Sequence, residues 1–194
     1  MPTFDFGHGP EPAHRHVNPD GSVGGWVAET AQVDPTCYIG PHAWVYGDAR
    51  VYGDAQVYGD AQVYGNAQVD GDARVYGDAR VSGNAQVDEN AQVSGKARVS
   101  GKARVYGDAQ VSGNAQVDSK DAIVWGRCGH YDYTAWRQVD RVVWLTYGCE
   151  SHSLDWWKQQ TEALSVKHHE PASHARYWQA VVALVEAVLT RDSQ

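Results

Sequence analysis

From Val27 to Val117, an aliphatic residue returns at every sixth position without any insertion or deletion. Between these residues run closely similar units such as YGDAQV, SGNAQV, DGDARV and SGKARV. A unit this short cannot bury its own valine, so it must stack on its neighbours. The repeat therefore predicts a solenoid with a continuous aliphatic core.

The period of six residues excludes a helix, because at 3.6 residues per turn the valines would point about 120° out of alignment. In a strand, residues two apart share a face, so Ala55 and Val57 point one way while Gln56 and Tyr58 point the other. A glycine such as Gly53 suits a sharp bend, because it adopts positive φ without strain. Each hexad is thus predicted to be one short strand followed by one bend.

This pattern over residues 27–121 resembles the hexapeptide-repeat family. The resemblance implies an all-β solenoid, a left-handed parallel β-helix of about five triangular coils with three hexads to a coil. The chain departs from the family in one respect: Gly53 and its equivalents come one position later than the family's glycine. That departure weakens the transfer of any active site.

The sequence divides into three parts, a leader over 1–26, the repeats over 27–121 and a C-terminal unit over 122–194. The first coil of a solenoid exposes strand edges, so we expect the leader to cap it, with Trp26 as a plug over the core. The C-terminal unit holds six of the eight tryptophans, which indicates a small globular core.

The C-terminal unit is predicted to be a small α+β cap. Residues 142–147 have the pattern of a strand, with 131–136 as its partner, and Ser153 is a suitable N-cap for a helix from Leu154. Pro171 would begin a second helix. Its expected apolar face consists of Tyr177, Val181, Leu184, Val185, Val188 and Leu189.

Composition limits the partners and the compartment. The net charge of −8 and the lack of a basic stripe argue against binding to a nucleic-acid backbone. No apolar run is long enough for a bilayer, and the first residues lack a signal-peptide core, so no membrane partner is expected. Three cysteines suit a reducing environment, and the expected location is cytoplasmic.

With three hexads to a coil, residues eighteen apart should stack in ladders, such as Gln56, Arg74, Gln92 and Gln110. The corner carboxylates should stack as well, Asp54 on Asp72 and Asp60 on Asp78. We expect these acids to be solvated turn residues. Calcium is the alternative, although interleaved asparagines and lysines break any regular metal site.

The hexapeptide-repeat resemblance also implies an alternative function, because many members are trimeric acyltransferases that use coenzyme A thioesters and a general-base histidine. Within the coils the only histidine is His42, and no loop interrupts the hexads to build a pocket. The sequence therefore favours a corner position for His42 over a catalytic one.

Two further constellations lie in the C-terminal unit. Cys128, His130, Cys149 and His152 supply the ligand types of a structural zinc site. The alternative is a buried cysteine in a strand and a histidine at a helix start. Cys149 also precedes the predicted helix, where a thiolate nucleophile assisted by His152 or Asp155 would be favoured. No other cofactor is expected.

The segments 147–157 and 18–27 resemble a group of bacterial and phage hexapeptide-repeat proteins that share a G-C-x-x-H-[ST] element. That resemblance brings no established activity, and a phage origin would fit a regulatory or counter-defence role.

We expect a non-catalytic scaffold or binding module, a homo-oligomer with a trimer favoured, that presents its C-terminal unit to a protein partner. The candidate anchors are Trp156, Trp157, Tyr177 and Trp178, unless these aromatic residues form the core of the unit itself.

Overall fold

The computed structural model describes residues 2–118, 123–128, 131–137, 142–147, 150–159, 179, 181–186 and 189. The chain forms two compact units, Met1–Lys120 and Asp121–Gln194.

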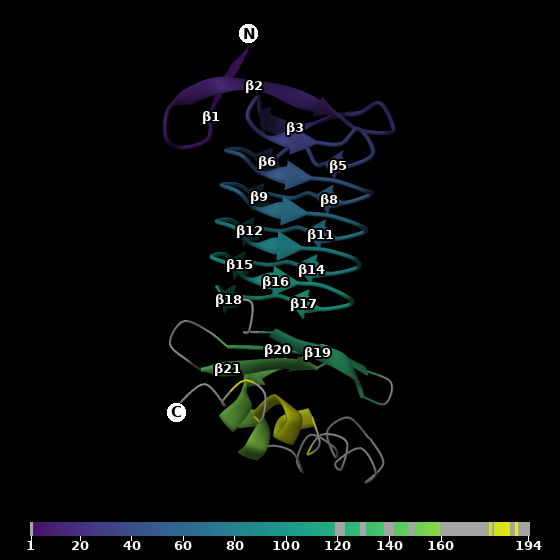
Figure 1. Cartoon of the computed structure of the whole chain (residues 1–194), viewed down its shortest axis with the longest axis vertical. Coiled ribbons are helices and arrows are strands. Elements are labelled where there is room, and N and C mark those ends of the chain that lie inside the picture. Colours follow the sequence, from purple (N-terminus) through teal and green to yellow (C-terminus); the bar gives the residue numbers. More distant parts are fainter. Residues whose placement is uncertain are drawn as a thin grey trace. The chain divides into compact units, whose positions relative to one another are not determined.

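The hexads form a β-solenoid, as the repeat predicts, and it has about five turns and three parallel sheets, as the family resemblance implies (Figure 1). Each coil contributes one two-residue strand to each sheet. The first sheet contains β4 (Gln32–Val33), β7 (Arg50–Val51), β10 (Gln68–Val69), β13 (Gln86–Val87) and β16 (Arg104–Val105). The second contains β5 (Tyr38–Ile39), β8 (Gln56–Val57), β11 (Arg74–Val75), β14 (Gln92–Val93) and β17 (Gln110–Val111).

The third sheet has eight strands, because the N-terminal strands extend it. Its strands within the coils are β6 (Trp44–Val45), β9 (Gln62–Val63), β12 (Arg80–Val81), β15 (Arg98–Val99) and β18 (Gln116–Val117). Before these come β1 (Thr3–Asp5), β2 (Pro10–Val17) and β3 (Val23–Ala28). Strands β1, β2 and β3 pair antiparallel, and β3 then pairs parallel with β6.

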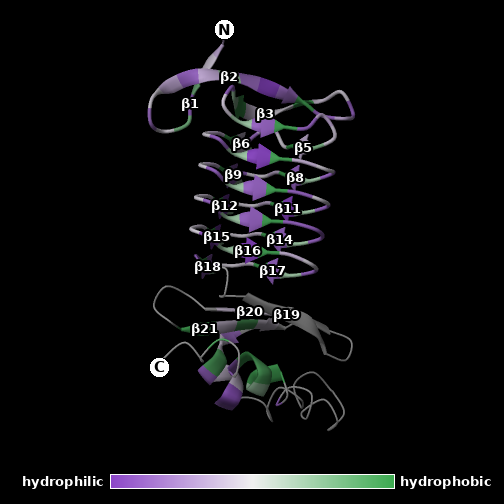
Figure 2. Cartoon of the chain, viewed as in Figure 1, coloured by the Kyte–Doolittle hydropathy of each residue, from purple (hydrophilic) through white to green (hydrophobic). Residues whose placement is uncertain are grey.

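The core is built from the valine and alanine of the hexads from Ala43 to Val117, with Cys37 and Ile39 at the same positions one hexad earlier. Ala55 and Val57 are completely buried, while Gln56 between them points outward and is half-buried. Figure 2 shows the resulting alternation of hydrophilic and hydrophobic residues along the coils. Residues eighteen apart stack as expected, for Arg74 pairs in register with both Gln56 and Gln92.

Glycines occupy the corners because the backbone there is left-handed. Gly53 has a φ of 66°, and a Cβ at this position would lie 3.0 Å from the backbone nitrogen of Gly71 in the next coil. Any side chain here would therefore suffer both an unfavourable φ and a backbone contact. Glu89, with a φ of 60°, is the one non-glycine residue with positive φ among the described residues.

The expectation that Trp26 plugs the end of the core is wrong. Val27 is the residue of β3 that faces inward, and strand alternation places Trp26 on the outer face, in register with Trp44. The Trp26 ring stacks on Phe4 at a centroid distance of 4.6 Å, and the Arg15 guanidinium lies 5.1 Å above it.

Buried polar side chains fix the leader to the first coil. The Asn18 amide oxygen accepts a hydrogen bond of 2.9 Å from the backbone N–H of Ile39. The His16 Nε2 lies 3.0 Å from the carbonyl oxygen of Cys37. These contacts satisfy backbone groups of the first coil that would otherwise lack partners.

The C-terminal unit contains a four-stranded antiparallel sheet in the order β19 (Ile123–Cys128), β20 (Tyr131–Arg137), β21 (Val143–Tyr147) and β22 (Glu150–Ser153). The predicted pairing of its two central strands is confirmed, with Trp136 opposite Trp144. Residues 154–159 and 181–186 are helical. Ser153 caps the first of these segments, since its hydroxyl accepts a hydrogen bond of 3.3 Å from the Trp156 backbone N–H. In the part of the chain that the structure describes, no helix is long and apolar enough to span a membrane.

The predicted apolar face of the second helix is correct in part. Three of its residues are buried, namely Val181, Val185 and Leu189. Leu184 is 46% exposed, whereas Val182, which was not predicted for this face, is buried in the core. The face follows the spacing of four residues from Val181 to Leu189, and Leu184 falls outside it. Tyr177 and Val188 lie outside the described residues.

Candidate functional site

His42 lies on an exposed corner of the solenoid between β5 and β6. The residue after it, Ala43, is completely buried and continues the regular hexad. The coil therefore holds His42 at its outer surface and provides no extruded loop beside it that could enclose a substrate. This is the corner position that the sequence favoured.

Only His152 of the four predicted zinc ligands has a described side chain. Cys128 ends β19, but its side chain lies outside the described part of the structure, as do His130 and Cys149 entirely. Among the described residues, no group of three or more His, Cys, Asp or Glu side chains could hold a metal ion. The zinc site and the Cys149 nucleophile therefore stay predictions.

Two of the four candidate anchors are described, and they differ in exposure. Trp157 is 1% exposed, and its indole N–H donates a hydrogen bond of 2.7 Å to the carbonyl oxygen of Leu145. Trp156 is half-buried and packs against the core of the unit. Tyr177 and Trp178 lie outside the described residues. Of the two described tryptophans, Trp156 is thus the more accessible.

The Trp156 ring is held in place by its neighbours. The His152 ring stacks on it at a centroid distance of 3.6 Å and an interplanar angle of 17°. Trp157 meets it edge-on at 5.2 Å. A salt bridge of 2.7 Å between Lys158 and Glu186 joins the helical segments 154–159 and 181–186. The exposed Leu184 lies on the second of these segments.

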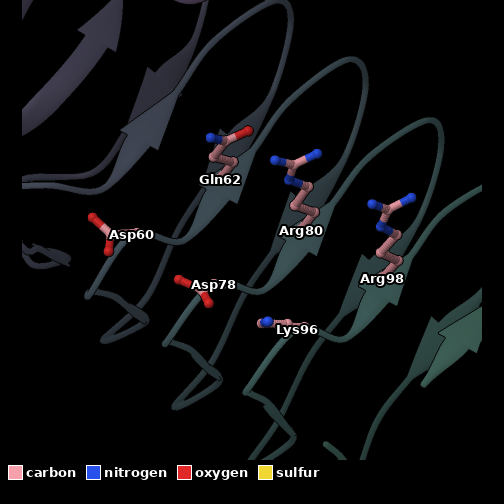
Figure 3. A pocket seen from close by; sticks show the side chains of 6 residues that line it. All are labelled: Asp60, Gln62, Asp78, Arg80, Lys96 and Arg98. Carbon is pink, nitrogen blue, oxygen red and sulfur yellow. The ribbon is translucent and has the colours of Figure 1, made fainter. Parts of the chain in front are cut away.

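A concave feature lies on the outer face of the third sheet of the solenoid. It is a hollow of about 310 Å³ (Figure 3). Figure 3 shows two columns of side chains along it, one from the corners and one from the strands. The corner column holds Asp60, Asp78 and Lys96, and the strand column holds Gln62, Arg80 and Arg98. We call this feature the Arg80–Arg98 groove.

Sequence analysis placed Asp60 and Asp78 at stacked corners but did not identify the groove. The signal was present, because Gln62, Arg80 and Arg98 are spaced eighteen residues apart and therefore form one ladder. Outward residues eighteen apart stack in all three sheets, and in the third sheet this spacing makes Arg80 and Arg98 neighbours.

Comparison with known proteins bears on the repeats alone. Residues 43–59, 73–89 and 91–107 match one repeat family. The repeats are similar to the YdcK beta solenoid repeat. Each matched stretch is almost one coil long, and none reaches the C-terminal unit. No match was found among curated proteins or among solved structures.

In the solenoid, burial makes Cys37 a poor nucleophile. Cys37 occupies an alanine position of a hexad and is completely buried, with its Sγ 3.5 Å from the carbonyl oxygen of Gly53. Burial, with a smaller contribution from the Asp34 charge, raises the pKa of the thiol to about 11. Thiolate chemistry at neutral pH is therefore disfavoured at this position.

Proposed function

We propose that the chain is a non-catalytic binding module, in which the YdcK-type solenoid is a rigid scaffold and the C-terminal unit contacts a protein partner. The observation that carries this proposal is the contrast between Trp157, which is in the core, and Trp156, which keeps part of its ring accessible. The chemistry of Trp156 suits an interface anchor, because a tryptophan buries a large area with few rotatable bonds.

The surroundings of Trp156 support this role. The His152 stack and the Ser153 cap fix the ring and its backbone, so little conformational entropy would be lost when a partner covers the ring. Leu184 adds exposed apolar surface to the same unit. The same unit carries the exposed charged pair Lys158 and Glu186, and charged residues suit the polar rim of an interface.

The solenoid supports the scaffold part of the proposal. From Ala43 to Val117 every hexad buries its valine and alanine, and the coils form registered ladders, such as Val57 with Val75 and Val75 with Val93. Each coil contacts only its neighbours, so stability accumulates along the stack. Such a solenoid is better suited to holding a binding surface in a fixed position than to changing conformation.

A pull-down with the full-length chain tests the proposal. A partner captured by the wild-type protein should be lost with Trp156→Ala, because truncation removes the anchor. The matched control is Tyr106→Ala, which removes an aromatic residue that is 43% exposed on the solenoid. Equal capture by the wild type and Trp156→Ala, with both proteins folded by near-UV circular dichroism, would contradict the proposal.

We also propose a homotrimer as the state of the scaffold. The flat faces carry ladders of Gln, Arg and Tyr, as in the stack of Tyr46 on Tyr64 at 4.9 Å, and such faces suit side-by-side packing. Sedimentation equilibrium measures the mass directly. A monomeric mass at every protein concentration would exclude the trimer.

The acyltransferase alternative has its own test. It predicts that coenzyme A raises the melting temperature and that His42→Ala loses the acyltransferase activity. A binding module of the proposed kind gives a flat coenzyme A titration in both proteins.

A further inference from the structure

We propose that the Arg80–Arg98 groove binds a small ligand that carries two neighbouring oxyanion groups, such as a dicarboxylate or a diphosphate. This site lies on the solenoid and does not depend on the proposed function of the C-terminal unit.

The first argument is the register of the two arginines. Arg80 and Arg98 are direct partners in adjacent parallel strands, which lie about 4.8 Å apart. In the other ladders of the solenoid, each arginine has no arginine beside it, as with Arg74 between Gln56 and Gln92. Two like charges side by side destabilise a sheet, and a bound anion would remove that repulsion.

The second argument is the state of the cations in the groove. Lys96 adds a third positive charge two residues before Arg98. Within the described part of the chain, no carboxylate lies within 4.0 Å of the charged nitrogens of Lys96, Arg80 or Arg98, whereas Arg104 reaches Asp88 at that distance. Figure 3 shows the two guanidinium groups side by side at the surface. Guanidinium groups so placed can each bind an oxyanion through two parallel N–H donors.

The acids of the groove restrict where an anion can lie. Asp60 and Asp78 occupy the corner column toward the N-terminal coils, while Lys96 follows in the same column. Their charges repel an anion from that end and favour the end at Arg98 and Lys96. The two ends of the groove therefore differ in charge, and the anion site is at the end formed by Arg98 and Lys96.

The size of the groove and the charge of the protein indicate the class of ligand. A hollow of about 310 Å³ is at the small end of the range for ligand sites, which suits a small molecule. The net charge of −8 gives the chain no general affinity for anions. Anion binding by this protein would therefore report the local arrangement of Arg80, Arg98 and Lys96.

Isothermal titration calorimetry at low ionic strength tests the site, with glutarate and inorganic pyrophosphate as probes. Arg80→Gln and Arg98→Gln should each weaken binding about tenfold or more, because each removes a charge-assisted contact. The same ladder carries glutamine in β9 and β18, on either side of the two arginines. A glutamine in place of either arginine is therefore a residue that this sheet already contains. Arg74→Gln, a ladder arginine outside the groove, is the matched control and should leave the affinity unchanged.

Two further comparisons sharpen the test. Asp78→Asn should tighten binding several-fold, because it removes a repelling carboxylate from the groove. Acetate and orthophosphate, at matched ionic strength, should bind more weakly than the two probes, because each offers one anionic group to two arginines. Preference for glutarate would identify a dicarboxylate ligand, and preference for pyrophosphate a diphosphate.

The proposal is overturned if neither probe gives saturable binding to the wild-type protein. It is also overturned if Arg74→Gln weakens binding as much as Arg98→Gln, since the effect would then be general electrostatics. Trp156→Ala should bind both probes like the wild type, so failure at the groove and failure of the proposed partner interface are distinguishable.

Discussion

Gly71 stacks directly on Glu89, and a Cβ added to Gly71 would lie 3.0 Å from the Glu89 backbone nitrogen. Glu89 holds the left-handed backbone that glycine adopts at the equivalent corners, with a φ of 60°. A side chain in this conformation costs about 1–2 kcal/mol. This corner is therefore a point of stored strain in an otherwise regular solenoid.

Glu89→Gly should stabilise the protein. We expect the free energy of unfolding to rise by about 0.5–1 kcal/mol, because relief of the φ strain exceeds the added entropy of glycine in the unfolded chain. Denaturant unfolding measures the change. Glu89→Ala is the control, since it keeps the Cβ, and an equal gain from Glu89→Ala would assign the effect to loss of the carboxylate.

Gly53→Ala should destabilise the protein more than Gly113→Ala. Both glycines have a φ of 66°, but a Cβ at Gly53 meets the Gly71 backbone, whereas one at Gly113 meets nothing within 4 Å. The Gly113 variant therefore shows the φ cost alone, about 1–2 kcal/mol, and the Gly53 variant adds the backbone contact. Equal unfolding midpoints for the two variants would show that coil contact is unimportant at the corner.

The buried Cys37 should make stability fall at high pH. Its thiol has a pKa of about 11 in the folded state against about 9.0 in the unfolded chain, so between these values the unfolded chain releases a proton that the folded chain retains. Stability is unaffected below about pH 9 and decreases from there toward pH 11, by roughly 1.4 kcal/mol for each unit of pKa difference.

Cys37→Ala isolates this effect, because alanine is the residue of the other hexads at the same position. Tyrosines and lysines titrate in the same range, so the measurement is the difference between wild type and Cys37→Ala in urea unfolding from pH 8 to 11. Parallel curves for the two proteins would contradict the assignment to Cys37.

Trp157→Ala should disrupt the C-terminal unit, while Trp156→Ala should leave it folded. Trp157 is 1% exposed and bonded to Leu145, so its truncation leaves a cavity and an unpaired carbonyl and costs about 3–5 kcal/mol. Trp156 is half-buried, so its truncation should lower the free energy of unfolding considerably less. Near-UV circular dichroism and thermal unfolding compare the two variants. Similar losses would place Trp156 in the core and remove it as an anchor.

The solenoid was predictable because its signal is a spacing. A core valine such as Val57 recurs at every sixth position, and that period predicts a stack of strand-and-bend hexads. The resemblance to the hexapeptide-repeat family implied three hexads to a coil, and with them the ladders of residues eighteen apart. The strand partners in the C-terminal unit were also predictable, because the patterns over 131–136 and 142–147 are local. Local patterning likewise identified Ser153 as a helix cap.

The remaining features depend on which way a side chain points and on what lies across from it. Trp26 was placed over the core because a large aromatic at the end of a repeat resembles a plug, yet its neighbour Val27 already faces inward. Trp156 and Trp157 are adjacent in the sequence and equally aromatic, and the tertiary packing that buries Trp157, which bonds to Leu145, cannot be read from the sequence pattern. The groove depends on Arg80 and Arg98 being neighbours across coils.

The uniform valine core has a consequence for how the length of this protein can change. Val57, Val75 and Val93 pair in register in successive coils and are all completely buried, so eighteen residues make one repeating unit of the stack. Losing or gaining eighteen residues would keep the phase of the hexads and therefore the register between the remaining coils. Each such event moves the two ends of the stack by one strand spacing, about 4.8 Å. The length of the solenoid can therefore change by whole coils while the packing of the core stays the same.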